Sequence, residues 1–410
     1  MLLAVGMSAQ PLSVEQYRAR VLEYNQDIKK SQEAVNGALY SLKGIKTGFF
    51  PKVDVSGNYS YQIENIEFFP GTDLKHDNYG VEAGLVQNIY SGSAVRKQYN
   101  SAKLQHAIAQ LAVEHTIDNI IYAADVSYWS VAANQDLYQL SQQFVGLVGE
   151  LYNIVNKRFE EGAISKTDVL MVQNRLKEAE LQLNTSVTNY KTALQSMNIM
   201  MGAEPNAEVI LTDSIQKVLW IPKAEGLDKA LEKRADYQAA IMNIEVAKLQ
   251  TDMVRSKYLP QLAVGLKEKY GTTLINIDGK SKWATTAFAQ VNIPVFHWGE
   301  MRQNVKMSRT QEQTKELERS QLKDQVSKEL NNAWVNVTET AKKLEIVYSS
   351  LEIAQDNLTL NTFSYNEGKL PIIDVLSAQV SWLQAYTNVV SVNYQYKVAL
   401  AEYAKALGSN

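Results

Sequence analysis

The chain alternates between short segments with a period of two and long segments with a helical period. In the short segments apolar residues fill every second position, as at Val53, Val55 and Tyr59, with polar residues between them. This alternation is typical of β-strands that expose one apolar face. It predicts one β-hairpin at about 53–90 and another at about 261–296.

The long segments predict helices of unusual length. No proline occurs from 92 to 161 or from 299 to 367. At about 1.5 Å per residue, each helix would span roughly 100 Å. Between Leu330 and Leu358 the apolar residues fall close to a heptad repeat, which favours coiled-coil packing. A shorter helix of roughly 35–40 residues is expected to return from the end of each long helix.

The turns between these helices are duplicated. Gly162, five residues and Asp168-Val169 recur 206 positions later as Gly368, five residues and Asp374-Val375. Such a long internal repeat indicates two matched structural halves. We expect a first repeat at 11–202, a connector at 203–226 and a second repeat at 227–410, joined in one continuous domain. The hairpin tips are expected near 162–168 and 368–374.

The same duplication reaches the ends of the strands. Pro51 and Pro260 stand just before the first strand of each β-hairpin, where a helix cannot continue. Gly92 and Gly299 stand just after the second strand. These four residues are the predicted transitions between helix and strand.

Composition narrows the possible functions. The chain has 44 acidic and 41 basic residues, so its net charge of −3 gives no broad attraction to nucleic acid. It has no cysteine, which excludes disulfides, cysteine-ligated metals and a cysteine nucleophile. The four histidines are scattered, and no catalytic constellation is evident. We therefore expect a protein that is not an enzyme and that needs no cofactor.

Residues 1–10 are similar to the end of a secretory signal peptide, with Ala9 as a plausible cleavage position; a frayed terminal tail is the alternative. The sequence contains no run of about 18 apolar residues, so any membrane crossing is expected to use β-strands. Open sheet edges are not tolerated in lipid, and a closed barrel needs at least about eight strands. Four strands per chain would supply eight in a dimer or twelve in a trimer.

Aromatic residues near the predicted strand ends agree with placement at membrane interfaces, although aromatic residues also favour strands in general. They are Phe49, Phe50, Tyr61, Tyr79, Tyr90, Tyr258, Tyr270, Trp283, Phe296 and Trp298.

The order and duplication of these features resemble the outer-membrane efflux proteins, or TolC-like outer-membrane factors, over essentially the whole chain. The resemblance implies an α+β membrane protein that forms a homotrimer in the outer membrane of a Gram-negative bacterium. Its twelve strands would form one transmembrane β-barrel, and its long helical hairpins would form a periplasmic α-barrel. The implied function is a passive exit duct for small molecules or proteins in tripartite efflux or type I secretion.

The resemblance also implies partners and roles. The partners are a periplasmic adaptor (membrane fusion) protein, an inner-membrane RND, ABC or MFS transporter, and outer-membrane lipid. The periplasmic gate candidates are Asp168, Tyr365 and Asp374. The residues expected at the hairpin tips, where an adaptor would dock, are Gly162, Ala163, Ile164, Gly368, Lys369 and Leu370.

Two details limit the resemblance at the tips. Some relatives have a basic residue where this chain has Leu370 and an acidic residue where it has Ser377, so a salt-bridge latch is not expected here. Asp168 and Asp374 are also candidates for capping the returning helices. The main alternative function is a soluble periplasmic coiled-coil scaffold or adaptor, which would explain the helices better than the strands.

Overall fold

The computed structural model describes residues 11–216, 220–272 and 276–409. The predicted signal-peptide remnant at 1–10 lies outside the described residues, as do 217–219 in the connector and 273–275 in the second β-hairpin loop. The helices are α1 (Val14–Tyr24), α2 (Gln26–Lys46), α3 (Ala94–Glu160), α4 (Lys166–Met200), α5 (Leu227–Lys233), α6 (Ala235–Ser256), α7 (Glu300–Asn366) and α8 (Ile372–Ala406). The strands are β1 (Pro11–Leu12), β2 (Lys52–Tyr61), β3 (Glu67–Phe69), β4 (Thr72–Asp73), β5 (Asp77–Ser91), β6 (Ile210–Leu211), β7 (Gln261–Gly271) and β8 (Lys282–Asn292).

The chain forms two compact units. The first unit consists of the chain up to Ser31, the segment Ala112–Gln238 and the chain from Leu322 onward. The second contains Gln32–Leu111 and Ala239–Gln321. Each unit therefore combines segments from both halves of the sequence. The division into repeats at 11–202 and 227–410 stays a prediction about the internal similarity of the chain.

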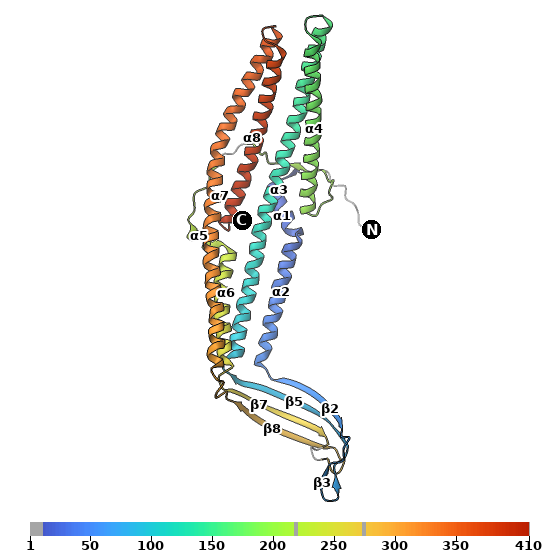
Figure 1. Cartoon of the computed structure of the whole chain (residues 1–410), viewed down its shortest axis with the longest axis vertical. Helices are drawn as coiled ribbons and strands as arrows, with labels where there is room; N and C mark the ends of the chain where they lie inside the picture. The colour runs from blue at the N-terminus through green and yellow to red at the C-terminus, as the bar shows by residue number, and fades with distance from the viewer. Residues whose placement is uncertain (1–10, 217–219, 273–275, 410) are drawn as a thin grey trace. The chain divides into compact units, whose positions relative to one another are not determined.

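The second unit contains one antiparallel sheet in the order β2, β5, β7, β8, and Figure 1 shows these strands side by side. The central pairing joins the two β-hairpins, with Leu85 opposite Leu266. Within the chain, β2 and β8 remain as edge strands. Apolar side chains of the sheet are exposed, with Val55 69% and Trp283 70% accessible. The sheet thus presents both apolar side chains and two unpaired edges.

The second β-hairpin is shorter than its apolar pattern predicts. β8 ends at Asn292 rather than near 296, so Ile293 and Val295 lie beyond the strand. Pro294 explains the early end, because proline has no N–H group to donate to a neighbouring strand. The loop of the first β-hairpin adds the small β3–β4 pair, which its sequence pattern did not predict.

The exits from the sheet place glycine where the backbone needs it. Gly92 has φ +60°, and a Cβ atom there would lie 2.7 Å from the carbonyl oxygen of Ser256. The Ser256 hydroxyl donates a 2.7 Å hydrogen bond to the Gly92 carbonyl. Gly299 has φ +84° with open space around it. Both positions require a left-handed backbone, but only at Gly92 is there also no room for a side chain.

The helical hairpins match each other in length. α3 and α7 each contain 67 residues, and α4 and α8 each contain 35. Figure 1 shows α4 returning beside α3 and α8 beside α7. The predicted heptad positions Leu330, Val337 and Leu344 of α7 are buried. None of the helices in the described ranges is both long and apolar enough to cross a membrane.

In the first unit, the connector contacts the start of the described chain. β1 pairs in parallel with β6, the short strand in the connector. Tyr128 of α3 is fully buried, and its hydroxyl donates to the Leu12 carbonyl at 2.9 Å. The Asp213 carboxylate lies 2.9 Å from the same hydroxyl and also accepts a hydrogen bond from the backbone N–H of Val14. These contacts tie the start of the described chain to α3 and to the connector.

Candidate functional site at the helical hairpin tips

The long helices end in the same turn in both hairpins. Gly162 has φ +75° and Gly368 has φ +72°. The N–H of Gly162 donates to the carbonyl oxygen of Phe159, and the N–H of Ala163 donates to that of Arg158, both at 2.9 Å. This pair of bonds is a Schellman motif, which closes a helix on a left-handed residue. Glycine is favoured there because it has no Cβ to clash.

The second tip repeats the motif residue by residue. The N–H of Gly368 donates to the carbonyl oxygen of Tyr365, and the N–H of Lys369 donates to that of Ser364, both at 2.9 Å. The predicted tip residues mostly face solvent: Gly162, Ala163, Gly368 and Lys369 are exposed, whereas Ile164 and Leu370 are half-buried.

The returning helices begin differently. Ser165 is the N-cap of α4, where its hydroxyl accepts from the Asp168 N–H at 3.3 Å and the Asp168 carboxylate accepts from the Ser165 N–H at 3.2 Å. This capping box satisfies two N–H groups that the helix itself leaves unpaired. Pro371 is the N-cap of α8 and makes no side-chain cap bond.

The expectation that Asp168 helps to cap α4 is confirmed through this capping box, whereas no side-chain cap bond is found at the start of α8, where Asp374 lies. Both lie at the third position of their helices, because α4 begins at Lys166 and α8 at Ile372. Asp168 still takes part in a cap from that position, through Ser165. Asp374 is half-buried, and its backbone N–H donates to the Pro371 carbonyl at 3.2 Å.

An apolar core lies under the tips and contains residues from both hairpins. Its buried members are Leu151, Val155, Val169, Val172, Tyr365, Ile372, Val375 and Leu376. Tyr365 is only 4% exposed, and its hydroxyl has no hydrogen-bond partner among the described residues. Burial raises the pKa of Tyr365; the adjacent Arg158 guanidinium offsets part of this rise, the Asp168 carboxylate adds to it, and the net shift is upward. The phenol therefore stays neutral at physiological pH.

Arg158 connects the two tips of the chain. Its guanidinium donates to the carbonyl oxygen of Tyr365 at 3.1 Å and to that of Asn366 at 2.9 Å. The same group lies 4.8 Å from the centre of the Tyr365 ring. These carbonyls belong to the last turn of α7, where C=O groups lack intrahelical partners and attract cations, although the Tyr365 carbonyl also accepts from the Gly368 N–H.

The structure thus brings Asp168 and Tyr365, two of the predicted gate residues, into one neighbourhood. The sequence interpretation missed Arg158, although comparison of the repeats offers a signal. Arg158 aligns with Ser364, so a cation occurs at this position in one copy only.

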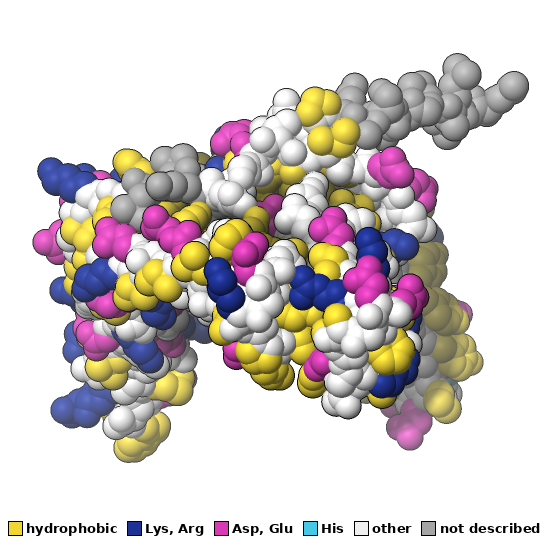
Figure 2. All heavy atoms as spheres, turned by 90° about the horizontal axis from the view of Figure 1, so that it is seen from above, with side chains coloured by type: hydrophobic (Ala, Val, Ile, Leu, Met, Phe, Trp, Pro, Cys, Tyr) yellow, Lys and Arg dark blue, Asp and Glu magenta, His cyan; other side chains and the backbone are white. Residues whose placement is uncertain are grey.

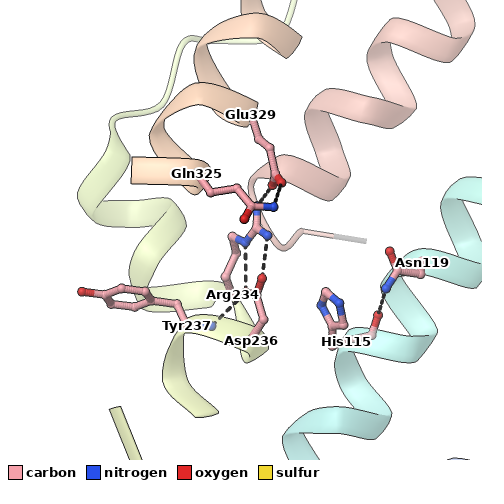
Figure 3. A network of polar contacts seen from close by, with 7 residues as sticks. All are labelled: His115, Asn119, Arg234, Asp236, Tyr237, Gln325 and Glu329. Carbon is pink, nitrogen blue, oxygen red and sulfur yellow. Dashed lines mark hydrogen bonds and ion pairs between the residues drawn. The ribbon is translucent and has the colours of Figure 1, made fainter. Parts of the chain in front are cut away.

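A second polar network lies in the first unit, away from the tips (Figure 3). Arg234 forms two hydrogen bonds with Asp236, at 3.0 and 2.6 Å, and one with Glu329 at 2.6 Å. Burial opposes ionisation of Asp236, but the bonds from Arg234 outweigh it and hold the pKa of Asp236 below its usual value. The cluster anchors the start of α6 to α7.

The network borders a pocket of about 370 Å³, and Figure 3 shows His115 and Asn119 of α3 nearby. Its walls have charges of both signs, from Arg234, Glu329, Glu402 and Lys405 among others. Arg234 is paired with two carboxylates, those of Asp236 and Glu329, and Lys405 lies over the Tyr122 ring at 4.9 Å. We interpret the network as a structural anchor.

Comparison with known proteins agrees with the geometry. The model of the family described as outer membrane efflux protein matches residues 18–203 and 226–409. Outer membrane protein TolC of Escherichia coli strain K12 is 21% identical over 417 residues, covering 94% of this chain and 80% of that protein. Toxin and drug export protein A of Aggregatibacter actinomycetemcomitans is 20% identical over 403 residues, covering 94% of this chain and 85% of that protein.

Solved structures share the fold over almost the full length. CusC superposes with a TM-score of 0.84 at 14% identity, covering 99% of this chain and 96% of that one. The outer membrane protein VceC of Vibrio cholerae gives a TM-score of 0.82 at 14% identity, with 96% of each chain covered. The family match over both halves, together with the shared fold, shows that the chain belongs to the outer membrane efflux protein family.

Proposed function

We propose that this chain is a gated exit duct in which three copies surround one conduit across the outer membrane. As a member of its family, the protein is an outer-membrane channel for efflux or secretion. The sheet supports the trimer: β2 and β8 are edge strands, and such edges need partners in lipid. Twelve strands from three chains would pair every edge. The exposed apolar side chains of the sheet would then face outer-membrane lipid.

The gate is proposed at the hairpin tips, with Asp168, Tyr365 and Asp374 as its residues. The observation that supports it most is the shared apolar core under the tips, which holds Tyr365 buried beside Asp168. Leu370 and Ser377 carry no charge, so closure here would depend on packing and on Asp168 rather than on a salt bridge through these two residues.

The proposed partners follow from the same tips. A periplasmic adaptor would dock on the six exposed or half-exposed tip residues, and an RND, ABC or MFS transporter in the inner membrane would supply energy. The tips offer apolar side chains beside charges of both signs, and Figure 2 shows such a mixture in the view down onto the hairpin ends. Among the relatives, AprF of Pseudomonas aeruginosa is named for alkaline protease secretion.

The alternative, a soluble periplasmic coiled-coil scaffold, fits the helical hairpins but leaves the exposed apolar sheet without a role. Reconstitution separates the two functions. We expect the protein to need detergent, to run as a trimer in native mass spectrometry, and to conduct ions across planar lipid bilayers. A detergent-free monomer without conductance would overturn the duct.

A further inference from the structure

We propose that the helix ends next to the sheet form a binding surface for anionic phospholipids, whose phosphate groups contact exposed lysines and arginines there. The inference rests on the proposed function, because it requires the sheet to lie in the outer membrane. It deepens that function by naming the class of lipid and the side chains that select it. The residues that carry the inference all lie in the second unit.

Basic residues gather where four helices meet the sheet. α2 and α6 end at this edge of the sheet, and α3 and α7 begin at it (Figure 1). The four segments nearest this edge together contain eleven basic and two acidic residues. These junction segments are 43–52, 94–103, 251–260 and 300–309. The opposite end of the sheet, at 62–78 and 271–282, contains three basic and five acidic residues, so the positive charge is confined to one end.

Contacts within the chain do not account for these charges. Nine of the eleven basic side chains are exposed, and the two half-buried ones are Lys97 and Arg255. Lys97 donates to the Ser256 hydroxyl at 3.3 Å. Arg255 pairs with Asp252 at 3.1 Å, and it is the one member of the set that forms an ion pair within the described part of the chain. The nine exposed cations are therefore available to a partner.

Helix dipoles explain only part of the arrangement. Lys43 and Lys46 lie in the last turn of α2, where cations are favourable. Arg96 and Arg302 instead lie in the first turns of α3 and α7, where the partial positive charge of the helix end disfavours cations. The first turn of α3 contains no acidic residue to offset this effect. A helix N-terminus and a cation both attract anions, so their coincidence favours phosphate.

The length of the strands places the junction segments at a membrane surface. β7 and β8 contain 11 residues each. At about 3.3 Å per residue and a tilt of about 45°, they span roughly 26 Å, close to the apolar band of about 25 Å in outer-membrane barrels. The helices therefore begin in the headgroup layer of the proposed membrane.

One face of α7 shows how far the charges extend from the sheet. Arg302, Lys306 and Arg309 are exposed and follow at i, i+4 and i+7, which places them on one face within about 14 Å of the helix start. A headgroup layer of roughly 5–8 Å and a screening length of about 8 Å together cover that distance. All three charges thus lie within electrostatic reach of the lipid phosphates.

Exposed aromatic side chains favour a lipid over a soluble anion as the partner. Phe296 and Trp298 stand just before α7 with their rings 4.8 Å apart, and Trp298 is 90% exposed. Tryptophan rings lie among headgroups at membrane interfaces, while long basic side chains extend toward the phosphates. A soluble anion makes no use of such rings. The combination of rings and cations points to phospholipids of the periplasmic leaflet.

Native mass spectrometry of the detergent-solubilised trimer tests the selectivity, with phosphatidylglycerol and phosphatidylethanolamine added at equal concentration. We expect the wild type to retain more phosphatidylglycerol, and its preference to fall as the ionic strength rises. Replacing Arg302, Lys306 and Arg309 together by glutamine should weaken phosphatidylglycerol retention by about fivefold for each charge removed. If this variant does not assemble, Lys43→Gln with Lys46→Gln on α2 gives the same comparison.

The matched control removes three exposed lysines from the same helix, further from the sheet. Lys323→Gln with Lys328→Gln and Lys343→Gln lies at least about 21 Å beyond Arg309, which exceeds the screening length. Its lipid retention should equal that of the wild type. Equal loss in both triple variants would overturn the proposal, as would equal retention of the two lipids by the wild type.

Three further outcomes would assign the charges to another partner and overturn the proposal. Millimolar inorganic phosphate that displaces the lipid would indicate a site for the free anion. Altered ion selectivity of conductance with unchanged lipid retention would place the charges in the conduit. Lost binding to purified peptidoglycan with unchanged lipid retention would indicate the cell wall. A wild type that conducts ions without lipid preference contradicts this inference alone, whereas a detergent-free monomer without conductance contradicts the proposed function.

Discussion

The guanidinium of Arg158 lies 4.8 Å from the centre of the Tyr365 ring, although the two residues are 207 positions apart in the sequence. This contact joins the ends of α3 and α7, the two long helices of the repeats. It stands beside Asp168, whose carboxylate takes part in the cap of α4. The tips of both hairpins are therefore coupled through packing, through backbone carbonyls and through charge.

Replacing Asp168 or Tyr365 by alanine is expected to make the closed duct leak. The tyrosine substitution removes a large side chain from the core under the tips, at a cost of about 3–5 kcal/mol by comparison with other buried aromatic residues. Single-channel conductance and sensitivity of cells to large antibiotics should both rise. Unchanged permeability in both variants would remove these residues from the gate.

Tyr365→Phe provides a sharper comparison. The Tyr365 hydroxyl is buried without a partner among the described residues. Replacing it by hydrogen keeps the ring and removes a polar group whose burial is unfavourable. We expect the conductance of this variant to equal that of the wild type and its thermal stability to equal or exceed that of the wild type. Leakage as large as that of Tyr365→Ala would show that the hydroxyl makes a contact across the mouth.

Gly92→Ala should destabilise the protein more than Gly299→Ala does. Both positions have positive φ, for which a non-glycine residue costs about 1–2 kcal/mol. Only at Gly92 would the added Cβ approach a backbone oxygen, that of Ser256, at 2.7 Å. Thermal unfolding of the detergent-solubilised trimer, followed by circular dichroism, measures both variants. Equal melting temperatures would show that the backbone near Gly92 shifts without cost.

Ser165→Ala is expected to loosen the first turn of α4. Loss of an N-cap costs about 1 kcal/mol, which corresponds to roughly fivefold faster local hydrogen exchange. Pro371→Ala is the control at the other tip, because Pro371 makes no side-chain cap bond. Exchange mass spectrometry on peptides from each tip compares the two. Similar losses of protection at both tips would argue against the capping box.

The Arg234 network predicts how stability depends on pH. The pKa of Asp236 is lowered in the folded protein, so its contribution is present above the unfolded value of about 3.9 and is lost as pH falls through the folded value. Acidification from neutral pH to about 3 should therefore lower the melting temperature of the wild type more than that of Asp236→Asn. A larger fall in melting temperature on acidification for Asp236→Asn than for the wild type would contradict the lowered pKa of Asp236.

Much of the architecture could be predicted because local signals determine it. These signals are the glycines with positive φ at the tips, the prolines before the strands and the period of the apolar residues. Each of them acts on residues only a few positions away. The same local reasoning could have ended β8 at Asn292, since Pro294 follows two residues later. It could not identify the N-caps securely, because Ser165 and Asp168 both favour the start of a helix.

The sequence by itself determined the lengths of the helices and the positions of the turns, through backbone preferences and periodicity. The tertiary structure alone decided the pairing of β5 with β7, the close approach of Ser256 to Gly92 and the bridge from Arg158 to Tyr365. Each of these joins residues that lie more than a hundred positions apart. Their meeting depends on how whole helices and strands pack, which no local preference specifies.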